Sequence, residues 1–143
     1  MLRWHVTGPG DTIRIGHRDF YAVDVMHTVP SLGFTVQNSG GVFAVSGDTR
    51  TNETLWPVLN ACDDLRVLVI EVSFPDEMAE LAIEAGHYTP GTLTADLERL
   101  NHDPEIWLTG MKPGEEGRIL RQVMDAAPNK NIRMLEAGTV LTV

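Results

Sequence analysis

The sequence predicts an α/β fold, or an α+β fold with segregated helices, built as one domain (residues 1–143) around a mixed sheet. In the first third of the chain, apolar and polar side chains alternate in two hairpin-like pairs, which is typical of antiparallel strands. Residues 65–74, LRVLVIEVSF, form a continuous aliphatic run, which is typical of a strand covered on both faces. From residue 51 onward helical and strand patterns alternate, which favours helices packed against the sheet.

The two hairpins come first in the chain. Apolar and polar residues alternate over residues 13–15, residues 16–19 are expected to turn, and residues 20–25 carry the return strand. The second hairpin spans residues 32–47. Its turn at residues 38–41, NSGG, consists of residues that tolerate positive φ.

Residues 51–62, TNETLWPVLNAC, predict a short helix. Thr51 is a plausible N-cap, and Pro57 limits the helix to its early turns because proline lacks the N–H that a helix interior needs. A second helix begins with Pro75 and ends at Gly86. The remaining pattern predicts a helix over residues 89–100, a strand over 105–110, a helix over 114–126 and two short strands over 131–143.

The charge and composition limit the classes of partner. The chain has a net charge of −9, with 11 Lys and Arg against 20 Asp and Glu, so we expect no binding of bulk nucleic acid. Arg3, Arg14 and Arg18 could still form a local basic patch. No apolar run approaches the roughly 20 residues that span a membrane, and we expect that the N-terminal residues do not act as a signal peptide. The single Cys62 fits a reducing, cytoplasmic location.

Four polar residues stand at or near the ends of predicted elements. His27 follows AVDVM, Asp48 follows VFAVSG, His87 follows the helix that ends at Gly86, and Glu71 interrupts the aliphatic run. In open α/β sheets the ligand crevice lies beyond strand ends, so these residues are candidates for one site. Imidazole and carboxylate together suit a divalent metal such as zinc or manganese.

Each of these residues also has a plain structural interpretation. A single loop histidine is often solvent-exposed or caps a helix, and Asp48 could form a turn or cap the helix that follows it. Glu71 could pair with a lysine or lie on an edge strand. Taken together, with glycines beside them, the residues favour a metal site.

Three segments carry a resemblance to a known family. Residues 22–49, AVDVMHTVPSLGFTVQNSGGVFAVSGDT, are similar to the middle of the metallo-β-lactamase superfamily, in the branch of class II cyclic-nucleotide and ribonuclease Z type phosphodiesterases. Residues 71–90 resemble that branch's acidic strand, helix and GHLTP-like loop. Residues 107–114, WLTGMKPG, resemble a segment that usually contains a histidine before a hydrophobe, Lys and Pro. The likeness extends from about His17 to Leu120.

The resemblance implies the C-terminal half of an αββα sandwich and a role for each candidate. His27 would bind one metal ion, and Asp48 would bridge two metal ions that clamp a phosphodiester. His87 would contact the scissile phosphate or protonate the leaving oxygen. Glu71 would orient His87. The substrate implied is a small nucleotide or another phosphodiester.

Two departures from the family pattern stand against a complete metal site. No HxHxDH motif is present, and the last metal-binding histidine falls at Gly110, which has no side chain. Only His27 and Asp48 remain, whereas a catalytic zinc normally takes three protein ligands. The chain is therefore either a metal-dependent phosphodiester hydrolase with an incomplete site, for example a fragment, or a non-catalytic, metal-free binding or dimerisation module. Whether it is an enzyme stays open.

Half of a sandwich would leave the inner face of one sheet exposed. Such a large apolar surface would be covered in a homodimer or by association with the missing half. We therefore expect self-association, and a monomer at micromolar concentration in light scattering would contradict it.

Overall fold

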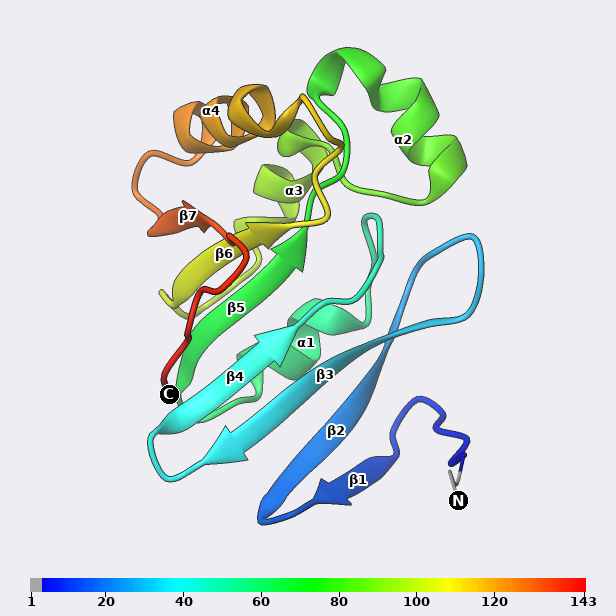
Figure 1. Ribbon diagram of the computed structural model, residues 1–143, viewed down its shortest axis with the longest axis vertical. Helices are drawn as coiled ribbons and strands as arrows, with labels where there is room; N and C mark the ends of the chain where they lie inside the picture. The colour runs from blue at the N-terminus through cyan, green and yellow to red at the C-terminus, as the bar shows by residue number, and fades with distance from the viewer. Residues whose placement is uncertain (1–3) are drawn as a thin grey trace.

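Seven strands form one mixed sheet in the order β1-β2-β3-β4-β5-β6-β7 in this computed structural model, which describes residues 4–143 (Figure 1). The strands are β1 (Thr12–Ile15), β2 (Arg18–Val25), β3 (Ser31–Asn38), β4 (Gly41–Val45), β5 (Leu65–Glu71), β6 (Glu105–Thr109) and β7 (Ile132–Met134). The helices are α1 (Leu55–Asn60), α2 (Ala79–Ala85), α3 (Pro90–Leu97) and α4 (Glu116–Ala126), with a 3-10 turn, η1 (Asp76–Met78), before α2. The mixed sheet with flanking helices confirms the predicted fold class.

Strand direction decides where the functional residues gather. β1 to β4 pair antiparallel, whereas β4 to β7 pair parallel. Because β2 lies two antiparallel steps from β4, its C-terminal end reaches the same edge of the sheet as those of β4, β5 and β6. In Figure 1 the arrowheads of β4, β5 and β6 point toward this edge. The loops after these four strands therefore meet at one place.

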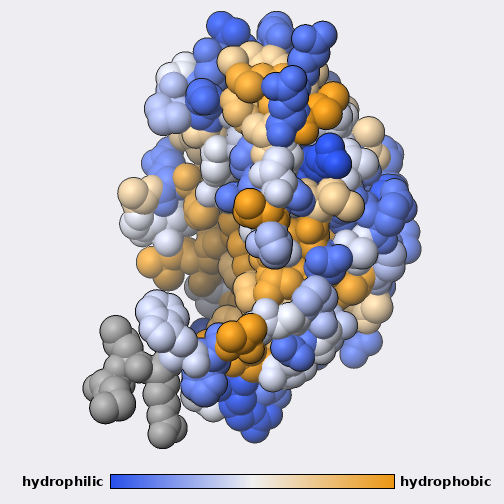
Figure 2. All heavy atoms as spheres, turned by 90° about the vertical axis from the view of Figure 1, so that its right-hand side faces the viewer, coloured by the Kyte–Doolittle hydropathy of each residue, from blue (hydrophilic) through white to orange (hydrophobic). Residues whose placement is uncertain are grey.

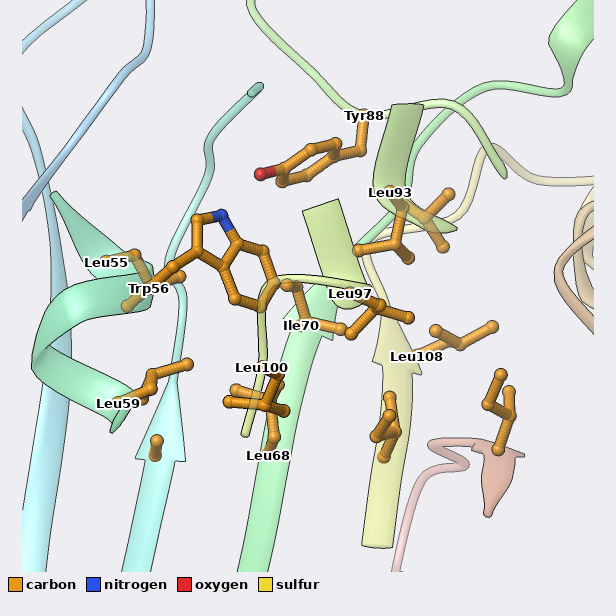
Figure 3. Packing of buried hydrophobic residues seen from close by; sticks show 14 of the residues in the cluster. Leu55, Trp56, Leu59, Leu68, Ile70, Tyr88, Leu93, Leu97, Leu100 and Leu108 are labelled. Carbon is orange, nitrogen blue, oxygen red and sulfur yellow. The ribbon is translucent and has the colours of Figure 1, made fainter. Parts of the chain in front are cut away.

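One face of the sheet is covered by helices, and the core lies there. Leu55, Trp56 and Leu59 of α1 and Leu93 and Leu97 of α3 pack with aliphatic side chains of β5 and β6 (Figure 3). Burial of side chains of this size contributes about 1.5–3 kcal/mol each. Tyr88 is fully buried in the same cluster, and its hydroxyl donates to Asp96 Oδ2 at 2.6 Å.

The opposite face of the sheet is also apolar. Cross-strand pairing aligns its side chains in rows from β2 to β6: Phe20, Phe34, Phe43, Val45, Val67, Val69 and Trp107. The segment after β7 crosses this face (Figure 1), and Asn38 Nδ2 donates to the Val143 carbonyl at 3.0 Å. Figure 2 shows hydrophobic residues gathered in a hollow on the side that carries the N-terminal hairpin. Self-association through the sheet stays a prediction.

Several local predictions are wrong. The first helix begins at Leu55 with Thr54 at its N-cap position, rather than near Thr51, and Asn52 Oδ1 accepts the Leu55 N–H at 2.9 Å. The predicted helix from Pro75 is divided into η1 and α2, although it ends at Gly86 as expected. Only the first of the two C-terminal strands, β7, forms within the described residues.

The basic patch that Arg3, Arg14 and Arg18 could form stays a prediction. Arg3 lies outside the described residues, and the Arg14 guanidinium pairs with Asp19 across the first hairpin. Within residues 4–143 no helix is long and apolar enough to cross a membrane.

Candidate active site at the strand ends

The structure brings the candidate residues to the shared edge of the sheet. His27 follows β2, Asp48 follows β4, Glu71 ends β5, and His87 follows α2. A pocket of about 330 Å³, called the strand-end pocket below, is lined by Asp48, Ser73, His87, Gly110 and Lys112, among others. The aromatic ring planes of His27 and His87 are tilted, with centroids 4.9 Å apart. The four residues predicted from separate elements therefore lie close together, although only Asp48 and His87 among them line this pocket.

His27 is positioned by the end of α2. Its Nδ1 lies 2.9 Å from the Gly86 carbonyl oxygen. Because a carbonyl oxygen only accepts hydrogen bonds, Nδ1 is the donor, and the lone pair of Nε2 is available to a ligand. Gly86 has φ of +78°, and a Cβ there would lie 2.8 Å from His27 Nδ1 and 2.9 Å from the Thr28 nitrogen. Both the backbone conformation and the close approach therefore require glycine at this helix end.

Asp48 is held in a loop that is tied to β3 and β5. Its carbonyl accepts from Ser31 Oγ at 2.7 Å, and the next residue, Thr49, donates its N–H to Glu71 Oε1 at 3.2 Å. Asp48 does not cap α1, whose N-cap position is Thr54. Gly47 has φ of +64°, and the space beside it is taken by the Leu32 carbonyl rather than by a ligand.

Glu71 is the best-buried carboxyl of the site, with 1% of its surface exposed. It lies on the central strand β5, so the edge-strand interpretation is wrong, and it pairs with a histidine instead of a lysine. Oε1 accepts the Tyr88 N–H at 3.0 Å, and Oε2 accepts from Ser73 Oγ at 2.9 Å. Burial raises the pKa of Glu71 to about 8, although these hydrogen bonds act in the opposite direction.

His87 is oriented by Glu71 and Ser73. Its Nδ1 lies 3.2 Å from Glu71 Oε1 and 3.1 Å from Ser73 Oγ, which leaves Nε2 free for a ligand. Burial lowers the pKa of His87 and the neighbouring His27 lowers it further, whereas Asp48 raises it. A histidine with these neighbours releases a proton readily from its imidazolium form.

The residues present do not complete a metal centre. Among residues 4–143, no group of three or more His, Cys, Asp or Glu side chains is placed to hold a metal ion. A catalytic zinc takes three protein ligands, and His27 with Asp48 supplies two. Gly110 lies in the strand-end pocket, and a Cβ there would make ordinary contacts with Glu71 Cβ at 3.5 Å and Ser73 Oγ at 3.6 Å. The space would admit a Cβ, but the φ of +73° at Gly110 favours glycine, so the chain supplies no ligand at this position.

Comparison with solved structures identifies the architecture. The metallo-β-lactamase fold protein YhfI from Bacillus subtilis superposes with a TM-score of 0.79 at 14% identity, over 95% of this chain and 54% of that one. The chain has the metallo-β-lactamase fold. Unliganded yeast PDE1 gives a TM-score of 0.72 at 18% identity, over 90% of this chain and 46% of that one. The metallo-β-lactamase resemblance seen in the motifs is therefore confirmed for the fold.

A third similar structure was solved with zinc. PqqB from Methylobacterium extorquens, in its Zn²⁺-bound form, gives a TM-score of 0.54 at 14% identity, over 96% of this chain and 51% of that one. The chain thus spans about half the length of the metallo-β-lactamase fold proteins YhfI, PDE1 and PqqB. No family model matches the sequence, and no curated protein matches it. At these identities the similarity shows the fold, so activity has to be inferred from the side chains.

Sequence reasoning missed three polar residues of the site. Ser73 lies two positions after Glu71, and this spacing could have placed both side chains on one face of an extended strand. Lys112 matches the Lys of the family pattern in WLTGMKPG, but that match gave it no role in the site. Arg50 follows Asp48 closely, but no spacing rule indicates that its side chain lines a pocket beside His87.

Proposed function

We propose that this chain carries the phosphoester-binding and proton-transfer part of a phosphodiester hydrolase site. The observation that carries the proposal is the arrangement of His87, which is held at Nδ1 by Glu71 and Ser73 in the same pocket as Asp48. An imidazole with one nitrogen fixed and the other free is suited to proton transfer at a bound ester. The fold and the motif resemblance support the same class of reaction.

In the proposed hydrolysis His87 is the proton donor to the leaving oxygen. A water oxygen bonds to phosphorus, the bond from phosphorus to the leaving oxygen breaks, and the protonated His87 gives its Nε2 proton to that oxygen. The proton lost by the attacking water goes to solvent, and His87 regains a proton from solvent. Glu71 and Ser73 keep the imidazole oriented through this cycle.

The substrate class follows from charge and family resemblance. With a net charge of −9, the chain repels long nucleic acids, whereas a single phosphodiester can enter a local site. We propose a small nucleotide, of the cyclic-nucleotide class, as the substrate. A divalent metal such as zinc or manganese would need donors in addition to His27 and Asp48.

A second candidate function is favoured by a specific observation. Gly110 leaves the position of an expected metal ligand without a side chain, and no three-residue ligand set exists among the described residues. A metal-free module that binds the same phosphoester without cleaving it fits these facts. The metal content of the purified protein separates the two functions: near-stoichiometric zinc or manganese favours the hydrolase, and its absence favours the binding module.

Hydrolysis of bis-p-nitrophenyl phosphate with added manganese or zinc tests the hydrolase proposal. We expect turnover that Asp48→Ala lowers about 10- to 100-fold, the range of losses seen when residues that support a metal site are changed. Asp24→Ala, at an exposed carboxylate of β2, is the matched control and should keep the wild-type rate. Absence of turnover, or turnover that does not depend on Asp48, would contradict catalysis by this chain.

A further inference from the structure

A second pocket adjoins His87. This pocket, called the side pocket below, has a volume of about 350 Å³ and is lined by Met26, Arg50, Thr51, Ile83, His87 and Thr92. His87 also lines the strand-end pocket. The imidazole therefore separates two pockets and borders both. A ligand that contacts His87 can extend into each of them.

The two pockets differ in chemical character. The strand-end pocket contains Asp48, Ser73 and Lys112, whereas the side pocket contains two large apolar side chains that are open to solvent. Met26 is 47% exposed and Ile83 is 58% exposed. Exposed apolar side chains beside a candidate proton donor are suited to cover the hydrophobic part of a ligand.

Each pocket also contains a cation without a carboxylate partner. Arg14, Arg66, Arg99 and Arg118 form ion pairs, but neither Arg50 nor Lys112 lies within ion-pair distance of a carboxylate in residues 4–143. A positively charged side chain without an ion-pair partner therefore stands on each side of His87, although the chain as a whole has a net charge of −9. Such cations are suited to an anionic ligand.

The backbone beneath both cations is firmly held. The Arg50 N–H donates to the Met26 carbonyl at 2.8 Å, and the Arg50 carbonyl accepts from Thr49 Oγ1 at 2.9 Å and from Asn52 Nδ2 at 3.1 Å. The Lys112 N–H donates to the Ser73 carbonyl at 3.0 Å, and the Lys112 ammonium lies 5.0 Å from the centre of the Phe74 ring. These hydrogen bonds fix the backbone positions of Arg50 and Lys112. The guanidinium and ammonium groups at the ends of their side chains remain available to bind a ligand.

We propose that the site binds its ligand across His87, with the phosphoryl group beside Lys112 in the strand-end pocket and the leaving alcohol in the side pocket. Arg50, Met26 and Ile83 then select an ester whose leaving alcohol bears a ring or another apolar body, as a nucleoside does. This assignment of the two pockets rests on the proposed function. If His87 protonates the leaving oxygen, the bond that breaks lies beside His87, so the phosphoryl group and the leaving alcohol fall in different pockets. It names Arg50 and Ile83 as specificity-determining residues.

Isothermal titration calorimetry in EDTA, which removes any contribution from metal, tests the proposal with adenosine 5′-monophosphate and inorganic phosphate as probes. We expect the nucleotide to bind at least about 10-fold more tightly than phosphate, because the side pocket holds the nucleoside. Arg50→Gln should weaken nucleotide binding about 10-fold, since it removes a charge-assisted contact. Ile83→Ser should weaken binding of the nucleotide and leave binding of phosphate unchanged.

Arg121→Gln, at an exposed arginine of α4 away from both pockets, is the matched control and should not alter either affinity. Equal affinities for nucleotide and phosphate, or nucleotide binding that is unaffected by Arg50→Gln, would overturn the proposal. Nucleotide binding that depends on Arg50 in a protein without hydrolytic activity would support the pocket assignment and contradict the hydrolase function. Hydrolysis that neither Arg50→Gln nor Ile83→Ser affects would support the hydrolase function and overturn the pocket assignment.

Discussion

His87→Asn is expected to slow hydrolysis of a cyclic nucleotide by about 10²–10⁴-fold, the usual contribution of a positioned proton donor. An alkoxide leaving group depends on protonation, whereas p-nitrophenolate departs readily without it. The same variant should therefore slow hydrolysis of bis-p-nitrophenyl phosphate much less. Initial rates for the two substrates, measured with the same protein preparation, give the comparison.

The difference between the two substrates separates proton transfer from positioning. An equal loss of rate for both substrates would show that His87 holds the ester without protonating it. His17→Asn is the control, because His17 lies in the exposed turn between β1 and β2 and contacts none of the site residues. It should leave both rates at the wild-type value.

Glu71→Gln is expected to remove a pH dependence of folding stability on the order of a few kcal/mol. Burial raises the pKa of Glu71 to about 8 from an ordinary value of 4.5. Between these pH values the folded chain keeps the proton that the unfolded chain has lost. The contribution of Glu71 is therefore fully present below pH 4.5 and is lost as the pH rises toward 8.

Urea unfolding of wild type and Glu71→Gln from pH 5 to pH 8 measures this effect. The wild-type free energy of unfolding should fall relative to that of the variant as the pH rises. The difference between the curves isolates Glu71, because other titrating groups such as His87 contribute to both. Glu80→Gln, at an exposed carboxyl of α2, should follow the wild-type curve. Parallel curves for wild type and Glu71→Gln would show that Glu71 is ionised in the folded chain.

The sequence was informative where one pattern determined the local structure. Alternation in residues 13–25 and 32–47 predicted both hairpins, and the aliphatic run of residues 65–74 predicted the buried strand β5, because side-chain burial directly requires these patterns. Gly86 predicted the end of α2, where the backbone is left-handed. The strand-end positions of His27 and Asp48 followed from the same hairpins.

Other features depended on tertiary contacts that local patterns do not contain. Thr51 and Asn52 are both good capping residues, and only the placement of the chain after β4 decides that Asn52 reaches the Leu55 N–H. The partners of Glu71 come from Thr49, Ser73 and Tyr88, which lie up to 22 residues away along the chain. The unpaired state of Arg50 likewise depends on which carboxylates the fold brings near it.

The most direct test of the central claim, that His27 and His87 face one phosphoester site, uses the chain's own histidines as reporters. Imidazole ¹⁵N NMR spectra are recorded while adenosine 3′,5′-cyclic monophosphate is added in EDTA, so that binding is observed without turnover. We predict that the Nε2 signals of His27 and His87 shift together with one binding constant. Those of His17, in the turn between β1 and β2, and of His102, in the loop before β6, should not move. No shift at His27 and His87 up to millimolar ligand, or equal shifts at all histidines, would contradict the account.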